Sequence, residues 1–500
     1  MTTTVIAGGG LAGLALALAL GGRGHRVRVL EQSEPPPDGP VVKSAELWRR
    51  PLVPQAGHDH ILNALGVRML RRYAPAVLDA ALAEGARLAD LTAAAPRGPG
   101  AAREPGDEDL VTLLVRRPVL DLVLHRAVAA LPGVTVSHRT TVAGLRLAPA
   151  GTTGHRVAGV VTDRGETVPA DLVVDASGRR SASRSWLAAA GVPVADDLTG
   201  PSRLRAFGRF YRLRDPDGPP PGPLNRGDAA GGVWDHYSAV LHPADNDVFA
   251  ITLGTLPGDR ATAALRTPGA FTAACGLSPF LAAWVDEGAA QPLGPVRVTG
   301  MPPNILRGAA TGRRRPVAGL LQTGDAACVT DPMFGRGMSL ALAHAFLLAD
   351  LLDERPVADE RLSQAAADLV ERVLRPWYDL GVRDSWSRVE RWRAAAGAPP
   401  APQAGRPAPL VPGGLPAASA AAVADLAVWR GLTRIRASLN TPAEIYADAD
   451  LLARARAAAD TPAPSPPSAP SVPPAPSAPP GLQPPTRAEL RHAIAAQEGR

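Results

Sequence analysis

Three acidic residues stand at the ends of short apolar stretches, where a carboxylate can accept hydrogen bonds from the hydroxyl groups of a ligand. Glu31, Asp175 and Asp325 each close such a stretch. Any one of them alone is more often a simple transition from strand to loop. Because the carboxyl ends of parallel strands meet at one edge of a sheet, the three together suit a long dinucleotide bound along that edge.

Glycines near the start of the chain have the spacing of a turn that binds a diphosphate. Gly8, Gly10 and Gly13 form the pattern G-x-G-x-x-G between an apolar stretch and an expected helix over 14–20. Gly8 allows a tight turn, Gly10 lets a pyrophosphate approach the backbone, and Gly13 lets the helix pack closely on the strand. The free amides of the helix face the phosphates, and Glu31 stands where a carboxylate can bind an adenosine ribose. The alternative is an ordinary strand–helix–strand unit, which explains the acid only by chance.

The composition indicates a globular protein with more than one structural unit. Its 500 residues are too many for one core, and no apolar run approaches the roughly 20 residues of a membrane helix. Cys275 and Cys328 are too few for a disulfide framework and are consistent with a reducing cytoplasm, where we expect the protein. The net charge of +6 comes almost wholly from scattered arginines, so we expect no nucleic-acid partner. The oligomeric state stays open.

The order of apolar and polar segments predicts an α/β protein with an insertion. Apolar strands alternate with helices in a pattern typical of a doubly wound parallel sheet. The segment from Pro462 to Pro485 holds twelve prolines and cannot bury a core. The expected parts are a discontinuous Rossmann-like dinucleotide-binding domain over 1–200 and 297–355, an antiparallel-sheet domain over 201–296, a helical region over 356–458, and a mostly disordered tail over 459–500.

The inserted segment differs from its surroundings because β-branched and aromatic residues concentrate in it. We expect an antiparallel sheet there, which is a natural wall for a substrate pocket. Tyr211 and His236 are its candidate substrate contacts, although a solvated strand position is an equally good interpretation of His236. The expected strands cover 209–213, 234–241 and 248–253, and the expected hairpin turn is 245–247.

The three acidic strand ends and their surroundings resemble the fingerprints of the class A flavoprotein monooxygenases, the group of the aromatic hydroxylases and squalene-epoxidase-like enzymes. The glycine turn resembles their ADP-binding site, and the stretch 175–181 resembles their central Asp-Gly motif. Residues 324–325 and 332–337 resemble their second flavin motif. The resemblance covers about residues 4–355. A narrower resemblance, to bacterial polyketide epoxidases, is carried by the stretches 53–60, 117–121, 175–187 and 438–440.

This resemblance implies an FAD-dependent monooxygenase that transfers one oxygen atom from O2 to an apolar or aromatic small molecule. The implied reaction is epoxidation or hydroxylation through a flavin C4a-hydroperoxide, in secondary metabolism, with NADH, NADPH or a separate flavin reductase as the electron source. Pro332, Phe334 and Gly335 are expected beside the flavin ring. The implied FAD-binding residues are Gly8, Gly10, Leu11, Ala12, Gly13, Glu31, Gln32, Arg50, Arg117, Asp175, Gly178, Gly324, Asp325, Pro332, Gly335, Gly337 and Met338.

The residues before an expected helix over 338–352 support the same interpretation. Gly335 and Gly337 let the backbone approach a flat ring, and the free amides of the helix then face that ring. Such a helix end stabilises the negative charge that a reduced flavin carries near N1 and the C2 carbonyl. The alternative is a pair of capping glycines in front of a core helix.

His58 and His60 are the most conspicuous acid–base candidates. Residues two apart do not share one face of a helix, and packing or hydrogen bonding is the more frequent role of such histidines. No acid–base pair can be assigned to the pocket. This slightly favours epoxidation, because an alkene attacks an electrophilic oxygen without losing a proton. No cluster of His, Cys, Asp and Glu has the spacing of a metal site, so we expect no metal.

Two other functions fit the same fold. One is an FAD-dependent reductase or dehydrogenase of the geranylgeranyl-reductase or halogenase-like type. Halogenation needs a placed lysine, and Lys43, the only lysine, stands in an expected loop without the usual tryptophan motif. The other is a flavin-binding scaffold whose Pro-rich tail recruits a partner.

Overall fold

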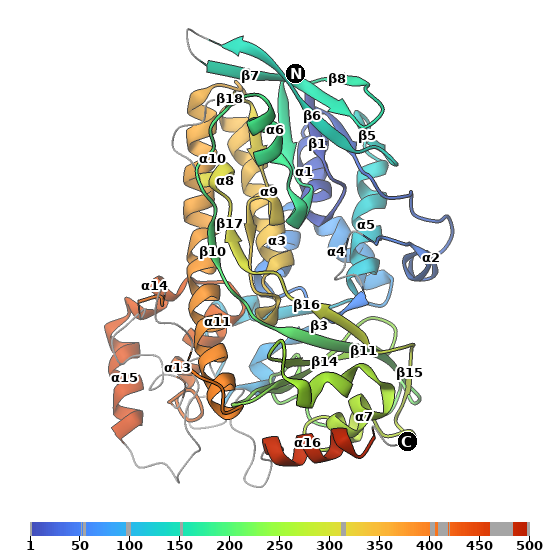
Figure 1. Ribbon diagram of the computed structural model, residues 1–500, viewed down its shortest axis with the longest axis vertical. Helices are drawn as coiled ribbons and strands as arrows, with labels where there is room; N and C mark the ends of the chain where they lie inside the picture. The colour runs from blue at the N-terminus through green and yellow to red at the C-terminus, as the bar shows by residue number, and fades with distance from the viewer. Residues whose placement is uncertain are drawn as a thin grey trace.

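The computed structural model describes residues 3–51, 53, 57–96, 102–150, 154–311, 317–400, 406–408, 419, 421–460 and 484–497. Figure 1 shows a parallel sheet with its helices in the upper half of the molecule and an antiparallel sheet in the lower half. The predicted α/β fold with an antiparallel sheet and a helical C-terminal region is confirmed. Among the described residues, no helix is long and apolar enough to cross a membrane.

The parallel sheet has five strands in the order β19-β9-β1-β2-β5. Val5, Val173 and Leu321 are fully buried, as expected for strands covered on both faces. The acids at the ends of β2, β9 and β19 therefore come to one edge of the sheet. The strands are β1 (Thr3–Ala7), β2 (Arg26–Leu30), β5 (Val134–Ser137), β9 (Leu172–Asp175) and β19 (Leu320–Gln322).

Helices cover one face of this sheet and a small second sheet covers the other. On the helical face, α1 (Leu11–Gly22) packs between α5 (Arg117–Ala129) and α9 (Gly337–Glu354). On the opposite face, apolar residues of the small sheet form a core with Val5 and Val173. The strands of the small sheet are β6 (Val142–Ala150), β7 (Gly154–Thr162), β8 (Thr167–Pro169) and β18 (Val317–Ala318).

Shorter elements complete this part of the molecule. The helices among them are α2 (Val41–Leu47), α3 (Ala64–Tyr73), α4 (Pro75–Ala83), α6 (Ser183–Ala189) and α8 (Gly308–Thr311). The strands are the pair β3 (Arg87–Asp90) and β4 (Val111–Leu114), and a three-stranded sheet of β10 (Leu198–Gly200), β17 (Asn304–Leu306) and β20 (Cys328–Val329).

The antiparallel sheet has the order β12-β13-β14-β11-β15, and β16 also pairs with β11. We expected β16 to rejoin the dinucleotide-binding part of the chain, but it pairs antiparallel with β11 from Arg297 to Gly300. A short strand carries no signal of the sheet it will join. The strands are β11 (Arg205–Leu213), β12 (Ala230–Val233), β13 (Ser238–Pro243), β14 (Val248–Thr255), β15 (Ala290–Pro292) and β16 (Arg297–Gly300).

Of two turns in this sheet, one was predicted from the sequence and the other was predicted as part of a strand. The β13–β14 turn lies where predicted, and Asn246 and Asp247 have φ values of 51° and 58°, which suit a tight hairpin. The strand expected over 234–241 begins only at Ser238. Residues 234–237 instead form the turn from β12, closed by a hydrogen bond from the Trp234 amide to the Tyr237 carbonyl.

Helices α10 (Glu360–Val373) and α11 (Arg375–Ala395) run down one side of the molecule toward the antiparallel sheet (Figure 1). After them follow α13 (Leu426–Arg436), α14 (Pro442–Tyr446) and α15 (Ala449–Asp460). The expected linker over 398–416 falls largely outside the described residues.

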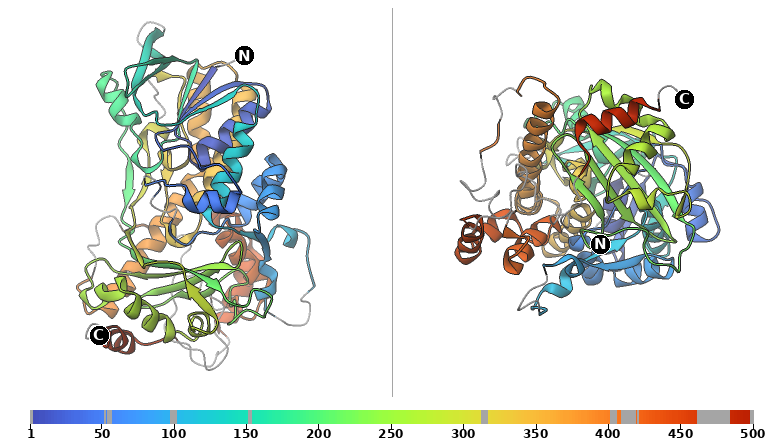
Figure 2. Two further views of the ribbon diagram at one scale, coloured as in Figure 1. Left: turned by 90° about the vertical axis from the view of Figure 1, so that its right-hand side faces the viewer. Right: turned by 90° about the horizontal axis from the view of Figure 1, so that it is seen from below.

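The segment expected to be mostly disordered contains one ordered helix near its end. Helix α16 (Arg487–Ala495) packs against α7 (Pro268–Gly276) beneath the antiparallel sheet (Figures 1 and 2). Leu490 and Ile494 are buried in the same core as the sheet's aromatic residues. Two apolar side chains one helical turn apart suffice to dock a short helix. The expected disorder over 461–483 lies outside the described residues.

Candidate active site

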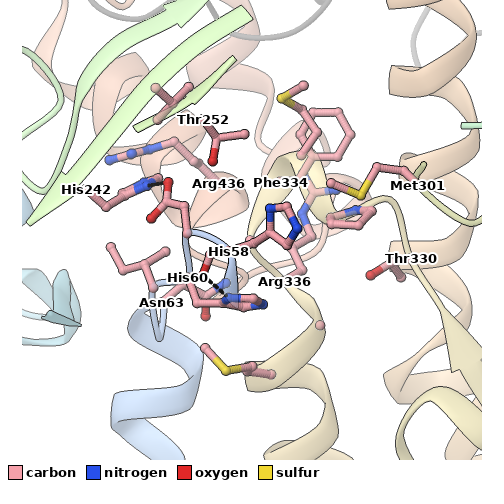
Figure 3. Close-up of a pocket in the computed structure, with 18 of the residues that line it drawn as sticks. His58, His60, Asn63, His242, Thr252, Met301, Thr330, Phe334, Arg336 and Arg436 are labelled. Carbon is pink, nitrogen blue, oxygen red and sulfur yellow. Dashed lines mark hydrogen bonds and ion pairs between the residues drawn. The ribbon is translucent and has the colours of Figure 1, made fainter. Parts of the chain in front are cut away.

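A cavity lies between the carboxyl edge of the parallel sheet and the antiparallel sheet (Figure 3). The turn after β1, the loops after β9 and β19, and the N-terminus of α9 line one side. Strands β11, β13 and β14 line the other, and the end of α13 completes the wall. The predicted residues that line it are Gly10, Leu11, Ala12, Arg117, Gly178, Gly324, Asp325, Pro332, Phe334, Gly335, Gly337 and Met338.

The three glycines of the first turn meet different surroundings. A Cβ atom on Gly8, whose φ is +114°, would lie 2.5 Å from the Ala176 carbonyl oxygen, and one on Gly13 would lie 2.0 Å from the Gly8 oxygen. A Cβ atom on Gly10 would meet nothing within 4 Å. Gly10 begins α1 and no side chain caps the helix. The turn therefore presents free helix amides next to open space, which is what a diphosphate requires.

Glu31 and Arg50 hold this turn from behind. The Gly9 amide donates to Glu31 Oε2 at 2.6 Å, and Arg50 Nη2 donates to the Gly9 carbonyl at 2.9 Å. Burial raises the pKa of Glu31, but Arg50 and hydrogen bonds from Ser33 and Gly9 outweigh it, so the pKa lies below its usual value. Arg50 also donates to Asp121 at 2.9 Å. Neither Glu31 nor Arg50 is among the cavity-lining residues, nor are Gly8, Gly13 and the exposed Gln32.

Asp175 organises the loop after β9 instead of facing the cavity. It is fully buried, and its Oδ1 accepts from the amide and hydroxyl of Ser177 at 2.9 and 2.6 Å. Its Oδ2 accepts from the hydroxyls of Ser181 and Ser183 at 2.6 and 2.5 Å. The loop held in this way brings Gly178, whose φ is +78°, to the cavity wall.

Asp325 is the predicted acid that does face the cavity. Burial raises its pKa, opposed by the charges of Arg117, Arg179 and Arg307. Within the described part of the chain, its carboxylate accepts no hydrogen bond. A carboxylate surrounded by arginines and open to the cavity is suited to accept from ligand hydroxyls.

The N-terminus of α9 also opens on the cavity. Gly335 has a φ of +62°, and a Cβ atom on Gly337 would meet nothing within 4 Å. The N-cap residue, Arg336, makes no side-chain cap. Its guanidinium stacks over Phe334 at 4.7 Å and lies 3.6 Å from Asp384. Burial raises the pKa of Asp384 to about 6, against the opposing charges of Arg336 and Arg388.

The residues that line the cavity can be compared with what binding of FAD requires. Two uncapped helix N-termini, of α1 and α9, face one cavity, and open space lies beside Gly10 and Gly337. The first suits a diphosphate and the second a flat ring that becomes negatively charged on reduction. Asp325 lines the same cavity with a carboxylate that can accept hydrogen bonds from hydroxyl groups. The residues present fit the group.

The two predicted substrate contacts lie away from the cavity. Residues on a strand alternate between its faces, and Ala206 of β11 lines the cavity while Phe207 and Tyr211 point into the core behind the sheet. Tyr211 stacks on Phe249 there, with 5.2 Å between ring centroids. His236 lies in the β12–β13 turn, and burial and Arg487 lower its pKa to about 4. Its neighbours are thus the residues that lead into α16.

His58 and His60 do line the cavity, as neutral side chains. Burial, with a contribution from Arg297, lowers the pKa of His58 to about 4. Burial and the charge of Arg117 lower the pKa of His60 to about 3. His60 Nδ1 lies 2.9 Å from the His58 carbonyl oxygen. Both therefore act as polar wall residues near neutral pH.

Sequence reasoning missed a group of charged residues on the same wall. His242 of β13 lies 2.6 Å from Asp59, measured from Nδ1 to Oδ2, and Arg436 of α13 lies 3.2 Å from Asp228. Arg226 also lines the cavity. These residues come from separate parts of the chain, and no local pattern links Asp59, in the stretch 53–60, to the others, so only the tertiary structure brings them together.

Comparison with solved structures finds the same fold in other proteins. PqsL of Pseudomonas aeruginosa, solved with 2-aminobenzoylacetate, superposes with a TM-score of 0.56 at 18% identity, over 78% of this chain and 98% of PqsL. The p-nitrophenol 4-monooxygenase PnpA from Pseudomonas putida gives 0.54 at 18% identity, over 77% and 89%. This is the fold of flavin-dependent monooxygenases. The flavin-dependent halogenase CmlS shares it, with a TM-score of 0.51 at 19% identity over 80% and 66%. No protein-family model and no curated protein sequence matches the chain.

Proposed function

We propose that this chain is an FAD-dependent monooxygenase that transfers one oxygen atom from O2 to an aromatic or apolar small molecule. The observation that carries the proposal is the cavity itself. The two free helix N-termini, which fit FAD, line one side of this cavity, and the antiparallel sheet lines the other side. The fold shared with flavin-dependent monooxygenases supports the same assignment.

Each part of the site has a distinct role in this proposal. The amides of α1 beside Gly10 hold the diphosphate, Asp325 accepts from the ribityl hydroxyls, and the N-terminus of α9 faces the ring. Bound FAD supplies the activation of O2, which no side chain can provide. The protein orients the substrate over the ring and excludes water through apolar residues from both halves of the wall. Those residues are Ala206, Val240, Leu432 and Ile435.

Halogenation is less well supported by the cavity. Lys43, the only lysine of the chain, lies exposed on α2 and is not among the residues that line the cavity. The lysine that halogenation needs is therefore not placed beside the ring.

Flavin spectroscopy tests the proposal. We expect the purified protein to retain FAD, and the reduced holoprotein to reoxidise rapidly with O2 through a transient spectrum that differs from those of oxidised and reduced flavin. Slow reoxidation without that transient would favour a reductase or a flavin-binding scaffold. A protein that cannot be reconstituted with FAD would end the proposal. Adding NADH, NADPH or a separate flavin reductase to the oxidised holoprotein identifies the electron donor.

A further inference from the structure

The wall of the cavity formed by the antiparallel sheet carries a set of charged and acid–base side chains that FAD binding does not use. We call it the polar wall, and it consists of Asp59, Arg226, Asp228, His242 and Arg436. Figure 3 shows His242 beside Arg436 on the side of the sheet, away from Thr330 and Met301. The five residues come from the segment before α3, the loop before β12, strand β13 and the end of α13.

The first feature of the polar wall is a carboxylate–imidazole pair. Asp59 Oδ2 lies 2.6 Å from His242 Nδ1, and 9% and 18% of the two side chains are exposed. The carboxylate accepts from Nδ1, so the ring proton stays on that atom and the lone pair stays on Nε2. Among the described residues, Nε2 makes no hydrogen bond. An oriented imidazole with a free Nε2 at a cavity wall is the arrangement of a general base.

The second feature is a pair of arginines, Arg226 and Arg436, beside that carboxylate–imidazole pair. Arg436 donates to Asp228 at 3.2 Å, and Arg226 lies near the same carboxylate. Burial, with the charge of Arg436, lowers the pKa of Arg226 to about 10, so it stays protonated at neutral pH. Two guanidinium groups thus face the Asp228 carboxylate, and with Asp59 the wall holds two positive and two negative charges while His242 is neutral. Once His242 holds a substrate proton, Asp59 balances the imidazolium, and the second guanidinium balances the substrate anion.

We propose that the substrate carries an acidic hydroxyl, a phenol or an enol, whose proton His242 removes. The O–H bond breaks, an N–H bond forms at Nε2, and the electron pair stays on oxygen as an anion next to Arg226 and Arg436. The charged oxygen raises the electron density of the ring or alkene that receives the oxygen atom. This proposal rests on the monooxygenase function above and favours hydroxylation, in place of the epoxidation that the sequence favoured.

The other histidines of the cavity are poorer bases. His58 and His60 have pKa values lowered by burial to about 4 and 3. Neither forms an ion pair with a carboxylate among the described residues, and His60 Nδ1 is already engaged with the His58 carbonyl. The groups that surround His242 are Asp59, Asp228, His60 and Arg436.

A pair of matched probes tests the proposal on the FAD-loaded protein. We would titrate 7-hydroxycoumarin, whose anion has its own absorption band, and its methyl ether, 7-methoxycoumarin, which has no acidic proton. At a pH where free hydroxycoumarin is mostly neutral, we expect the wild type to bind it as the anion. His242→Gln and Asp59→Asn should weaken its binding about ten- to a hundredfold, because a hydrogen bond to a charged group is lost. Binding of the methyl ether should not change.

His25→Gln is the matched control, because His25 pairs with Asp353 at 3.1 Å on the protein surface, outside the cavity. It should leave the binding of both probes unchanged. The proposal is overturned if the wild type binds no probe, if it holds hydroxycoumarin in the neutral form, or if a folded His242→Gln or Asp59→Asn protein still binds the anion normally. FAD content and flavin reoxidation are recorded on the same samples. Normal anion binding with failed reoxidation would contradict the monooxygenase function and leave the hydroxyl site standing.

Discussion

The position of an acidic residue at the end of a strand did not tell whether its side chain lines the cavity or holds the backbone behind it. Glu31, Asp175 and Asp325 all end strands of the parallel sheet, yet only Asp325 lines the cavity. The carboxylate of Glu31 is occupied by the amides of Gly9 and Ser33, and that of Asp175 by an amide and hydroxyls of its own loop. A carboxylate engaged in this way holds the backbone that lines the cavity.

Replacing Asp325 by alanine should weaken FAD binding. The loss of a charged acceptor for ligand hydroxyls costs about 1.5–3 kcal/mol, which is roughly a ten- to hundredfold change in affinity. Asp175→Ala should lower thermal stability instead, because four hydrogen-bond donors, one of them the buried Ser183 hydroxyl, lose their acceptor. Equilibrium dialysis of FAD and thermal unfolding separate the two effects. Unchanged FAD affinity in a folded Asp325→Ala protein would remove this residue from the site.

The histidines of the wall make stability depend on pH. The pKa of His60 is lowered to about 3 by burial and Arg117, so between pH 6.5 and 3 the unfolded chain binds a proton that the folded protein does not. Stability is therefore fully present above pH 6.5 and falls as the pH drops. His60→Asn should reduce the slope of unfolding free energy against pH by up to about 1.4 kcal/mol per pH unit in this window. Denaturant unfolding at several pH values measures the slope, and an identical slope would contradict a neutral His60.

At the scale of helices and strands, substitutions in the first glycine turn should affect either FAD affinity or folding, depending on which glycine is replaced. Gly10→Ala places a Cβ atom in open space at the helix N-terminus, so we expect normal stability and FAD affinity lowered at least about tenfold. Gly13→Ala forces a contact of 2.0 Å with the Gly8 oxygen and should unfold the turn. Gly22→Ala, in open space at the far end of α1, is the control. Loss of stability in Gly10→Ala would show that the glycine serves packing.

The elements that the sequence predicted well are those whose signal is local. Apolar runs predicted β1 and β9, and the glycine spacing predicted the start of α1. Asn246 and Asp247 predicted a hairpin turn. The pairing of β16 and the Asp59–His242 contact could not be predicted, because each depends on which distant segments meet. Tyr211 shows the intermediate case. Its strand was predicted, but the face it uses is set by the register of the whole sheet.

For the molecule as a whole, α16 should contribute to stability. Leu490→Ala removes a side chain that is 2% exposed and should cost about 2–3 kcal/mol of unfolding free energy. Arg491→Ala, exposed on the same helix, should change it by less than about 0.5 kcal/mol. Urea denaturation compares the two. Equal stability of both variants would mean that α16 does not dock in solution.

The docking of α16 also bears on how the protein is made. Ala290 is the last residue that the antiparallel sheet adds to its core, and about 200 residues separate it from Leu490. At roughly 5–20 residues per second, a ribosome needs about 10–40 s to cover that distance. During this time the apolar surface of α7 that α16 covers is exposed, and chaperones and neighbouring nascent chains have access to it. Docking of α16 ends that exposure.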